Sequence, residues 1–234
     1  MTFFRYLIFY CVLFVFSALL PNTTFAQFGG GLSGEVGGGL TQLYGEMAHK
    51  PLKPGYHLGI DYIVIPFVSV GLQGMMGKLA ADDWTGRSAE NNYIGANINA
   101  KARLGLVLNG GGGNFELNYI REPFFKSLIR NLYIGAGIGF LRNDVEARRS
   151  TSEDPNFVGA DKSKGAFVPL NAGIDIPFGY SLSGPTWAVN VNAQLGLYFG
   201  DELDGYANMY SQHDDRLFYF SLSIKRSFLH NVKR

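Results

Sequence analysis

Two groups of acidic residues and one histidine are the side chains whose types could support catalysis. Asp82 and Asp83 are adjacent, and His213, Asp214 and Asp215 follow one another nearer the carboxyl terminus. A histidine beside carboxylates can activate water by general base catalysis, which is hydrolase chemistry. Ser211, two residues before His213, would add a nucleophile of the lipase or acyltransferase kind. Such residues in polar loops are usually only solvated, so we expect no enzyme.

Other ligand-type residues form no recognisable site. Asp201, Glu202 and Asp204 with Gly205 offer oxygen ligands for calcium, but the order of a twelve-residue calcium loop is absent. Three further histidines, which are His49, His57 and His230, are dispersed along the chain. We therefore predict no metal site and no cofactor.

Charged and amide side chains inside alternating segments form the most informative pattern. Three acidic and three basic residues share the face opposite to the aliphatic one: Glu35, Asp61, Asp175, Lys101, Arg103 and Lys225. The same face carries the amides Asn97, Asn99, Asn171, Asn190, Asn192 and Gln194. Buried charges persist when they are paired and hydrogen-bonded, so a common interior for these residues predicts a closed polar network rather than a wide pore.

Alternation of period two, which is typical of β-strands, recurs along the chain. In residues 93–109, for example, Ile94, Ile98 and Leu104 lie on one face, whereas Asn97, Asn99 and Lys101 lie on the other. Eight such segments are predicted, at residues 32–44, 56–65, 68–79, 93–109, 132–142, 166–176, 187–199 and 217–228. The piece 115–120 also alternates, so ten strands remain an alternative.

The connections between these segments alternate between short and long. Tight turns are predicted around Pro66 and Pro177, and longer polar links at 45–55, 80–92, 143–165 and 200–216. Short turns at one end and long loops at the other are typical of outer-membrane barrels. The link 109–131 is long but falls at the short-turn end, where we predict a periplasmic insertion with a Gly-rich hinge and a short amphipathic helix. Residues 143–165 are predicted to be the longest extracellular loop.

The amino terminus has the features of a secretory signal peptide. Arg5 precedes an apolar run at 6–20, and small residues at Thr24 and Ala26 place the predicted cleavage before Gln27. The run is shorter than the roughly 20 residues that a spanning helix needs. Cleavage removes Cys11, the single cysteine, and leaves 19 Lys and Arg against 19 Asp and Glu. The exported chain, residues 27–234, can form no disulfide, and its zero formal charge argues against nucleic-acid binding.

The composition decides which face is predicted to point inward. Charged residues make up 17% of the chain, against about 25% in soluble domains. A soluble ligand-binding barrel such as a lipocalin would turn the aliphatic face inward, but the polar face has too few Lys and Glu for a solvent-exposed surface. Small polar residues suit the narrow interior of an eight-stranded barrel. We therefore predict an all-β, antiparallel, up-and-down transmembrane β-barrel with the aliphatic face in lipid, and aromatic side chains at both ends of the strands as interfacial girdles.

The chain resembles the small outer-membrane β-barrel proteins of Bacteroidota, with an OmpA/OmpX-type, porin-like barrel. The resemblance rests on residues 35–40, 132–140 and 204–206 before the closing strand. That last strand is similar to the aromatic-ended signal that the barrel-assembly machinery recognises, with Phe220, Leu222, Ile224 and Phe228 as its residues, although six residues follow Phe228. A weaker resemblance is to barrels associated with type IX secretion and gliding.

These features predict a non-enzymatic barrel in the outer membrane of a Gram-negative bacterium. Its expected role is structural or adaptor-like, with a plugged polar lumen, and its expected partners are outer-membrane lipid, the assembly machinery, and an envelope protein that binds the loops or the 109–131 insertion. The alternatives are a small porin for ions or solutes, an accessory barrel of type IX secretion, and a rim hydrolase of the omptin or lipase type.

Overall fold

The chain of 234 residues is described by a computed structural model at residues 31–44, 49–65, 67–82, 88–105, 128–148, 162–181, 184–199, 203 and 215–229. The predicted signal peptide lies outside these residues. Within them, no helix combines the length and the apolar character that a membrane-spanning helix requires.

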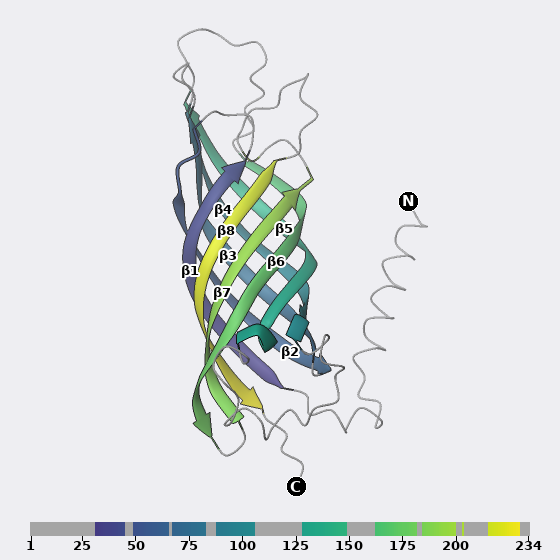
Figure 1. Ribbon diagram of the computed structural model, residues 1–234. Helices are drawn as coiled ribbons and strands as arrows, with labels where there is room; N and C mark the ends of the chain where they lie inside the picture. Colours follow the sequence, from purple (N-terminus) through teal and green to yellow (C-terminus); the bar gives the residue numbers. More distant parts are fainter. Residues whose placement is uncertain are drawn as a thin grey trace, which may run out of the picture.

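Eight antiparallel strands close into a barrel (Figure 1). Each strand pairs with the next one along the chain, and β1 pairs with β8. The strands are β1 (Leu32–Tyr44), β2 (Lys53–Ile65), β3 (Val68–Asp82), β4 (Ser88–Arg103), β5 (Leu132–Arg148), β6 (Lys162–Ser181), β7 (Gly184–Tyr198) and β8 (Arg216–Leu229). The predicted up-and-down barrel of eight strands is confirmed. The ten-strand alternative is wrong, because β1 and β8 close the sheet on each other.

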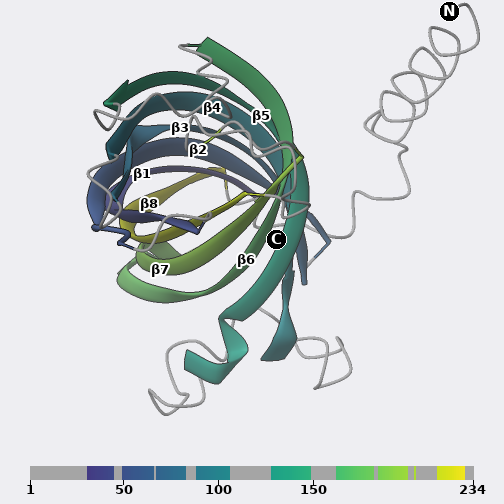
Figure 2. The same ribbon diagram turned by 90° about the horizontal axis from the view of Figure 1, so that it is seen from above.

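The register fixes the width of the barrel. A path of hydrogen-bonded neighbours once around the wall returns to β1 ten residues further on, through Leu32, Tyr62, Val70, Ala100, Ala136, Leu170, Leu195, Phe218 and Gln42. For eight strands, this stagger corresponds to a tilt of about 40° and a backbone radius of about 8 Å. Figure 2, which looks along the barrel, shows the eight strands around this narrow interior. A lumen of this width is filled by side chains.

The two ends of the barrel differ in their connections. Only two residues separate β2 from β3, and two separate β6 from β7, at the end that holds Ile65 and Gly184. We call this the short-turn end, and it also holds the start of β1 and the end of β8. The opposite end, which holds Tyr44 and Arg216, is called the long-loop end. A helical turn at Leu128–Arg130 precedes β5 at the short-turn end. The rest of the predicted insertion lies outside the described residues.

Several predicted strand boundaries are wrong, mostly at the long-loop end. There β6 begins at Lys162 rather than at residue 166, and β5 continues to Arg148. At the short-turn end, β4 stops at Arg103, after which Leu104 and Gly105 are helical. The turn predicted around Pro177 is also wrong. Strand β6 runs through this proline to Ser181, with Pro177 paired to Ala188 of β7.

The aliphatic side chains cover the outside of the barrel. Val36, Ile138 and Phe140 are 65%, 67% and 70% exposed, whereas Asn97 and Asn99 on the opposite face are 2% and 3% exposed. Side chains of adjacent residues in a strand point to opposite faces, so the alternation in the sequence becomes an apolar outside and a polar inside. This distribution is the reverse of that in a soluble barrel.

Candidate functional site

A network of six charged residues fills the lumen at the short-turn end. Lys225 Nζ lies 2.7 Å from Asp61 Oδ2 and within 3.5 and 3.6 Å of carboxylate oxygens of Glu35 and Asp175. Lys101 Nζ is 3.1 Å from Asp61 and 3.6 Å from Glu35. Arg103 Nη2 extends the network to Asp175 at 3.6 Å. The structure thus brings together all six residues that the sequence placed on the inner face, and their formal charges sum to zero.

Five strands position these side chains, and glycines make the room for them. Glu35 of β1 and Lys225 of β8 are direct cross-strand partners. Gly71 of β3 is the neighbour of Asp61, and a methyl group at Gly71 would collide with the Asp61 carboxylate. A methyl group at Gly59 would lie 3.0 Å from Glu35 Oε1. Inward-facing glycine therefore gives the carboxylates the space to turn toward the two lysines.

Amide side chains occupy the lumen beside the charges. Asn97 donates a hydrogen bond to Gln73 Oε1 at 3.0 Å, and Asn99 donates to Asn97 Oδ1 at 2.9 Å. On the opposite wall, Asn190 donates to both Asp175 and the Tyr133 hydroxyl at 2.8 Å. Further amides continue this second group, as Asn192 donates to Asn171 at 3.3 Å and the Tyr133 hydroxyl donates to Asn192 at 3.1 Å. Gln194 is 1% exposed and lies in the same interior.

The lumen toward the long-loop end is mainly apolar, contrary to the expectation of small polar residues throughout, although Asn91, Asn143 and Ser163 are also buried there. The buried side chains there are Leu43, Met75, Leu79, Ala81, Ala89, Tyr93, Leu141, Val145, Phe167, Tyr198, Leu203, Leu217 and Tyr219. They occupy inward-facing positions of the strands. Leu43, for example, lies an even number of residues after the inward-facing Glu35 and Thr41 on β1. This half of the interior is therefore packed mainly with hydrophobic side chains, and the buried asparagines among them are hydrogen-bonded, as Asn143 is to Ser163.

His57 and Leu203 mark the two boundaries of this apolar layer. The His57 ring meets the Tyr219 ring edge-on, with Nδ1 2.8 Å from the Tyr219 hydroxyl, where the polar half begins. At the long-loop end, Leu203 is fully buried, its N–H donates to Asp215 Oδ2 at 2.9 Å, and its carbonyl accepts from Asn91 at 2.8 Å. Asp215, a catalytic candidate in the sequence, is 1% exposed and holds this residue in the mouth of the barrel.

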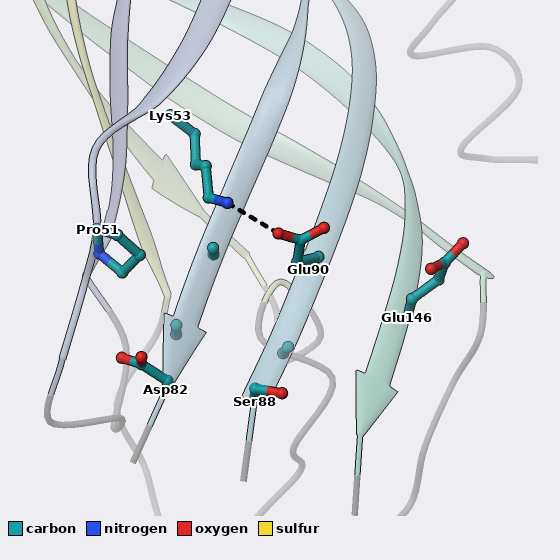
Figure 3. Close-up of a pocket in the computed structure, with 9 residues that line it drawn as sticks. Pro51, Lys53, Asp82, Ser88, Glu90 and Glu146 are labelled. Atoms are coloured by element: carbon teal, nitrogen blue, oxygen red, sulfur yellow. Dashed lines mark hydrogen bonds and ion pairs between the residues drawn. The ribbon is translucent and has the colours of Figure 1, made fainter. Parts of the chain in front are cut away.

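Of the remaining catalytic candidates, Asp82 is the one that the structure describes. His49 Nδ1 lies 2.6 Å from Asp82 Oδ1, and both side chains are more than half exposed. Ser88 is the cross-strand neighbour of Asp82, but its side chain points away from the carboxylate in Figure 3. Asp83, Ser211, His213 and Asp214 lie outside the described residues, as do the calcium candidates Asp201, Glu202 and Asp204. The His49–Asp82 pair is thus a solvent-exposed hydrogen-bonded pair with no adjacent serine nucleophile among the described residues.

An outward-facing pocket of about 620 Å³ adjoins this pair at the long-loop end (Figure 3). Lys53 reaches across it to Glu90 with an Nζ–Oε1 distance of 2.8 Å, and Glu146 and Pro51 line the sides. Two of the three carboxylates in the pocket have a side-chain partner, Asp82 the imidazole of His49 and Glu90 the ammonium group of Lys53. Among the described residues, no group of three His, Cys, Asp or Glu side chains is arranged to hold a metal ion.

The residues of the predicted assembly signal share the outer face of β8. Phe220, Leu222, Ile224 and Phe228 are 44%, 54%, 51% and 58% exposed, and β8 is one of the two strands at which the barrel closes. The structure places them on the outer face, in the arrangement that the sequence predicts.

No protein-family model matches this chain, and a search of curated proteins finds no match. Solved structures with a similar backbone include Ail, the attachment invasion locus protein of Yersinia pestis, at 8% identity and a TM-score of 0.47, covering 86% of this chain and 99% of that one. Neisserial surface protein A matches at 8% identity and a TM-score of 0.47, covering 84% and 97%. The outer membrane protein OprG from Pseudomonas aeruginosa matches at 8% identity and a TM-score of 0.38, covering 86% and 97%.

Proposed function

We propose that this chain is an integral outer-membrane β-barrel whose lumen is closed and whose role is structural or adaptor-like. The observation that carries the proposal is the inverted distribution of side chains. Exposed aliphatic residues cover the wall, and six charged residues are paired inside it. Water disfavours exposed aliphatic side chains and favours charged side chains on the outside of a protein. A lipid bilayer accounts for both the aliphatic outside and the charged interior.

The outer apolar surface has the height of a membrane. Outward-facing apolar residues run from Leu132 to Phe140 on β5 and from Ala166 to Phe178 on β6. With a rise of about 3.3 Å per residue and a tilt of about 40°, these runs span roughly 20 and 30 Å, which brackets the usual band of about 25 Å. Among the described residues, Arg226 is in register with Trp187 and Phe178 at the short-turn edge of this band, and the band between its two edges contains no charged side chain on its outer face. A charge there would cost about 2 to 4 kcal/mol at the midplane.

The connections orient the barrel in the proposed membrane. Outer-membrane barrels have short periplasmic turns and longer extracellular loops, so the short-turn end faces the periplasm. The ionic network then lies in the periplasmic half, and the pocket beside Lys53 and Glu90 lies at the extracellular rim.

The filled lumen favours an adaptor over a porin. Three layers follow one another along the interior: the ionic network, the amides, and the apolar cluster capped by Leu203. Ions would have to displace paired charges in one half and enter a hydrophobic core in the other. The two rims are therefore the surfaces left for a partner, and the resemblance of residues 35–40 and 132–140 to small Bacteroidota barrels supports an envelope role of this kind.

Reconstitution tests the proposal in two steps. The mature chain is refolded into phosphatidylcholine vesicles, and a shift in gel mobility between unheated and heated samples reports the folded barrel. Folding of the chain as a soluble protein, without vesicles or detergent, would contradict the membrane assignment. Single-channel recording in a planar bilayer, with a porin of known conductance as the positive control, then tests closure. We expect no steady openings, and steady openings of the wild-type protein would favour the porin alternative.

A further inference from the structure

Arg226 is a cation on the outer face of the barrel, at the short-turn edge of the apolar band and in register with Trp187 and Phe178. It is exposed, and its direct cross-strand neighbours are Trp187 of β7 and Gly34 of β1. The preceding outward position on β8 is Ile224, which pairs with Val189 of β7. The Arg226 side chain therefore lies at the boundary where apolar residues give way to the periplasmic rim.

Two aromatic rings hold the guanidinium group at this boundary. Arg226 Cζ is 5.1 Å from the centre of the Trp187 ring and 5.8 Å from that of Phe228. Phe178 stacks on the other side of Trp187, with ring centres 6.5 Å apart and planes at 22°. Gly34 leaves room for Phe228, because a methyl group at Gly34 would approach its ring to 2.9 Å. The rings thus restrict the position of a planar group that carries five N–H donors.

No acidic side chain among the described residues pairs with Arg226. Its interactions within this part of the chain are with the two rings. By contrast, the inward-facing cations Lys101, Arg103 and Lys225 all have carboxylate partners. A guanidinium group without a counter-charge, beside an apolar wall, is complementary to an anion that is itself attached to apolar chains.

We propose that Arg226, held between Trp187 and Phe228, binds the phosphate of a phospholipid in the periplasmic leaflet. The guanidinium group matches a phosphate with two parallel hydrogen bonds, and tryptophan is favoured at headgroup depth. The acyl chains of the same lipid would lie against Ile224 and Val189. This inference rests on the proposed outer-membrane location. The alternative partner of Arg226 is the barrel-assembly machinery, because Phe228 and Ile224 are also residues of the predicted assembly signal.

The experiment measures lipid binding to the folded chain by native mass spectrometry from detergent. The two probes are a phosphatidylglycerol and a diacylglycerol with the same acyl chains, so that they differ in the phosphate-containing headgroup. The variants are Arg226→Gln and, as a matched control, Arg142→Gln, which alters an exposed outward-facing arginine at the opposite end. Arg226→Lys retains the charge and removes the planar group, so its expected affinity for phosphatidylglycerol lies between those of the wild type and of Arg226→Gln. The gel-mobility shift confirms that each variant is folded.

We expect Arg226→Gln to weaken phosphatidylglycerol binding about fivefold, which corresponds to about 1 kcal/mol, and to leave diacylglycerol binding unchanged. Arg142→Gln should leave both unchanged. Equal phosphatidylglycerol affinities of wild type and Arg226→Gln would overturn the inference, as would equal losses in the two variants. Unchanged lipid binding together with slower folding by purified assembly machinery would assign Arg226 to that machinery instead. Failure of the wild-type chain to insert into vesicles would refute the proposed function itself.

Discussion

Replacement of Lys225 by methionine is the sharpest test of the ionic network. Among the described residues, Lys225 Nζ is the one group that contacts all three carboxylates of the ionic network, at 2.7, 3.5 and 3.6 Å. Methionine has a similar length and no charge, so it fills the space and leaves three carboxylates facing only Lys101 and Arg103. Removal of one partner from a buried ion pair typically costs 3 to 5 kcal/mol, because the remaining charge stays buried and uncompensated. We expect a loss of about that size.

Equilibrium unfolding in urea, with the protein in phosphatidylcholine vesicles and tryptophan fluorescence as the signal, measures this loss. Lys162→Met is the matched control, since it removes the same group from an exposed pair with Asp144 whose atoms are 3.9 Å apart. An exposed pair contributes little, so we expect a change below about 0.5 kcal/mol. The double variant Lys225→Met with Asp61→Asn restores two charges of each sign, and its loss should be smaller than the sum of the single losses by about 1 kcal/mol or more.

The reasoning would be refuted if Lys225→Met and Lys162→Met lowered the free energy of unfolding by the same small amount. That result would mean that the interior charges are hydrated, and the lumen would then not be closed by ion pairs. Strict additivity of Lys225→Met and Asp61→Asn would lead to the same conclusion.

Two further predictions concern the interior. Arg103→Ala removes the cation that lies 3.6 Å from Asp175, and we expect it to lower the temperature at which the gel-shifted form is lost; an unchanged temperature would argue against the network. Gly137→Ala places a methyl group 2.8 Å from the Asn99 Cα inside the wall, so we expect little folded protein. Gly74→Ala faces outward, with the nearest atoms at 4.0 Å, and should fold normally, as judged by the gel shift; similar yields of the two alanine variants would contradict the crowding of the inner face at Gly137.

The strands and their two faces could be predicted from the sequence because the lipid environment that we propose for this barrel imposes a strict rule. Every outward position in the band must be apolar, so the alternation at residues 94–102 or 132–140 is uninterrupted. The ionic network could be predicted for the same reason, because a charged residue with inward parity has to find its partners inside. The ends of the strands could not be predicted. Beyond the lipid the rule no longer holds, and β6 extends past the apolar band to Lys162 at one end and Ser181 at the other.

The apolar layer of the lumen was missed, although its signal is in the sequence. Leu43 has the parity of Thr41, and Met75 has the parity of Gln73, so both had to face inward. The pairing of His57 with Tyr219, which are 162 residues apart, depends on the closure of the barrel and carries no local signal. The partnership of His49 with Asp82 likewise arises where residues before β2 reach the end of β3, rather than from the His213 cluster that suggested catalysis.

An accessibility scan along β5 tests most directly the claim that lipid contacts the aliphatic face. Single cysteines replace Leu132, Ile134, Ala136, Ile138 and Phe140 on the outer face, and Tyr133 and Leu141 on the inner face, of the mature chain, which lacks the native Cys11 under the predicted cleavage; each is spin-labelled in vesicles. Electron paramagnetic resonance then measures collision with oxygen, which enters lipid, and with a water-soluble nickel chelate. We predict high oxygen and low nickel accessibility at the five outer positions, and low accessibility to both at Tyr133 and Leu141. High nickel accessibility at Ile134 and Ile138 would contradict the account.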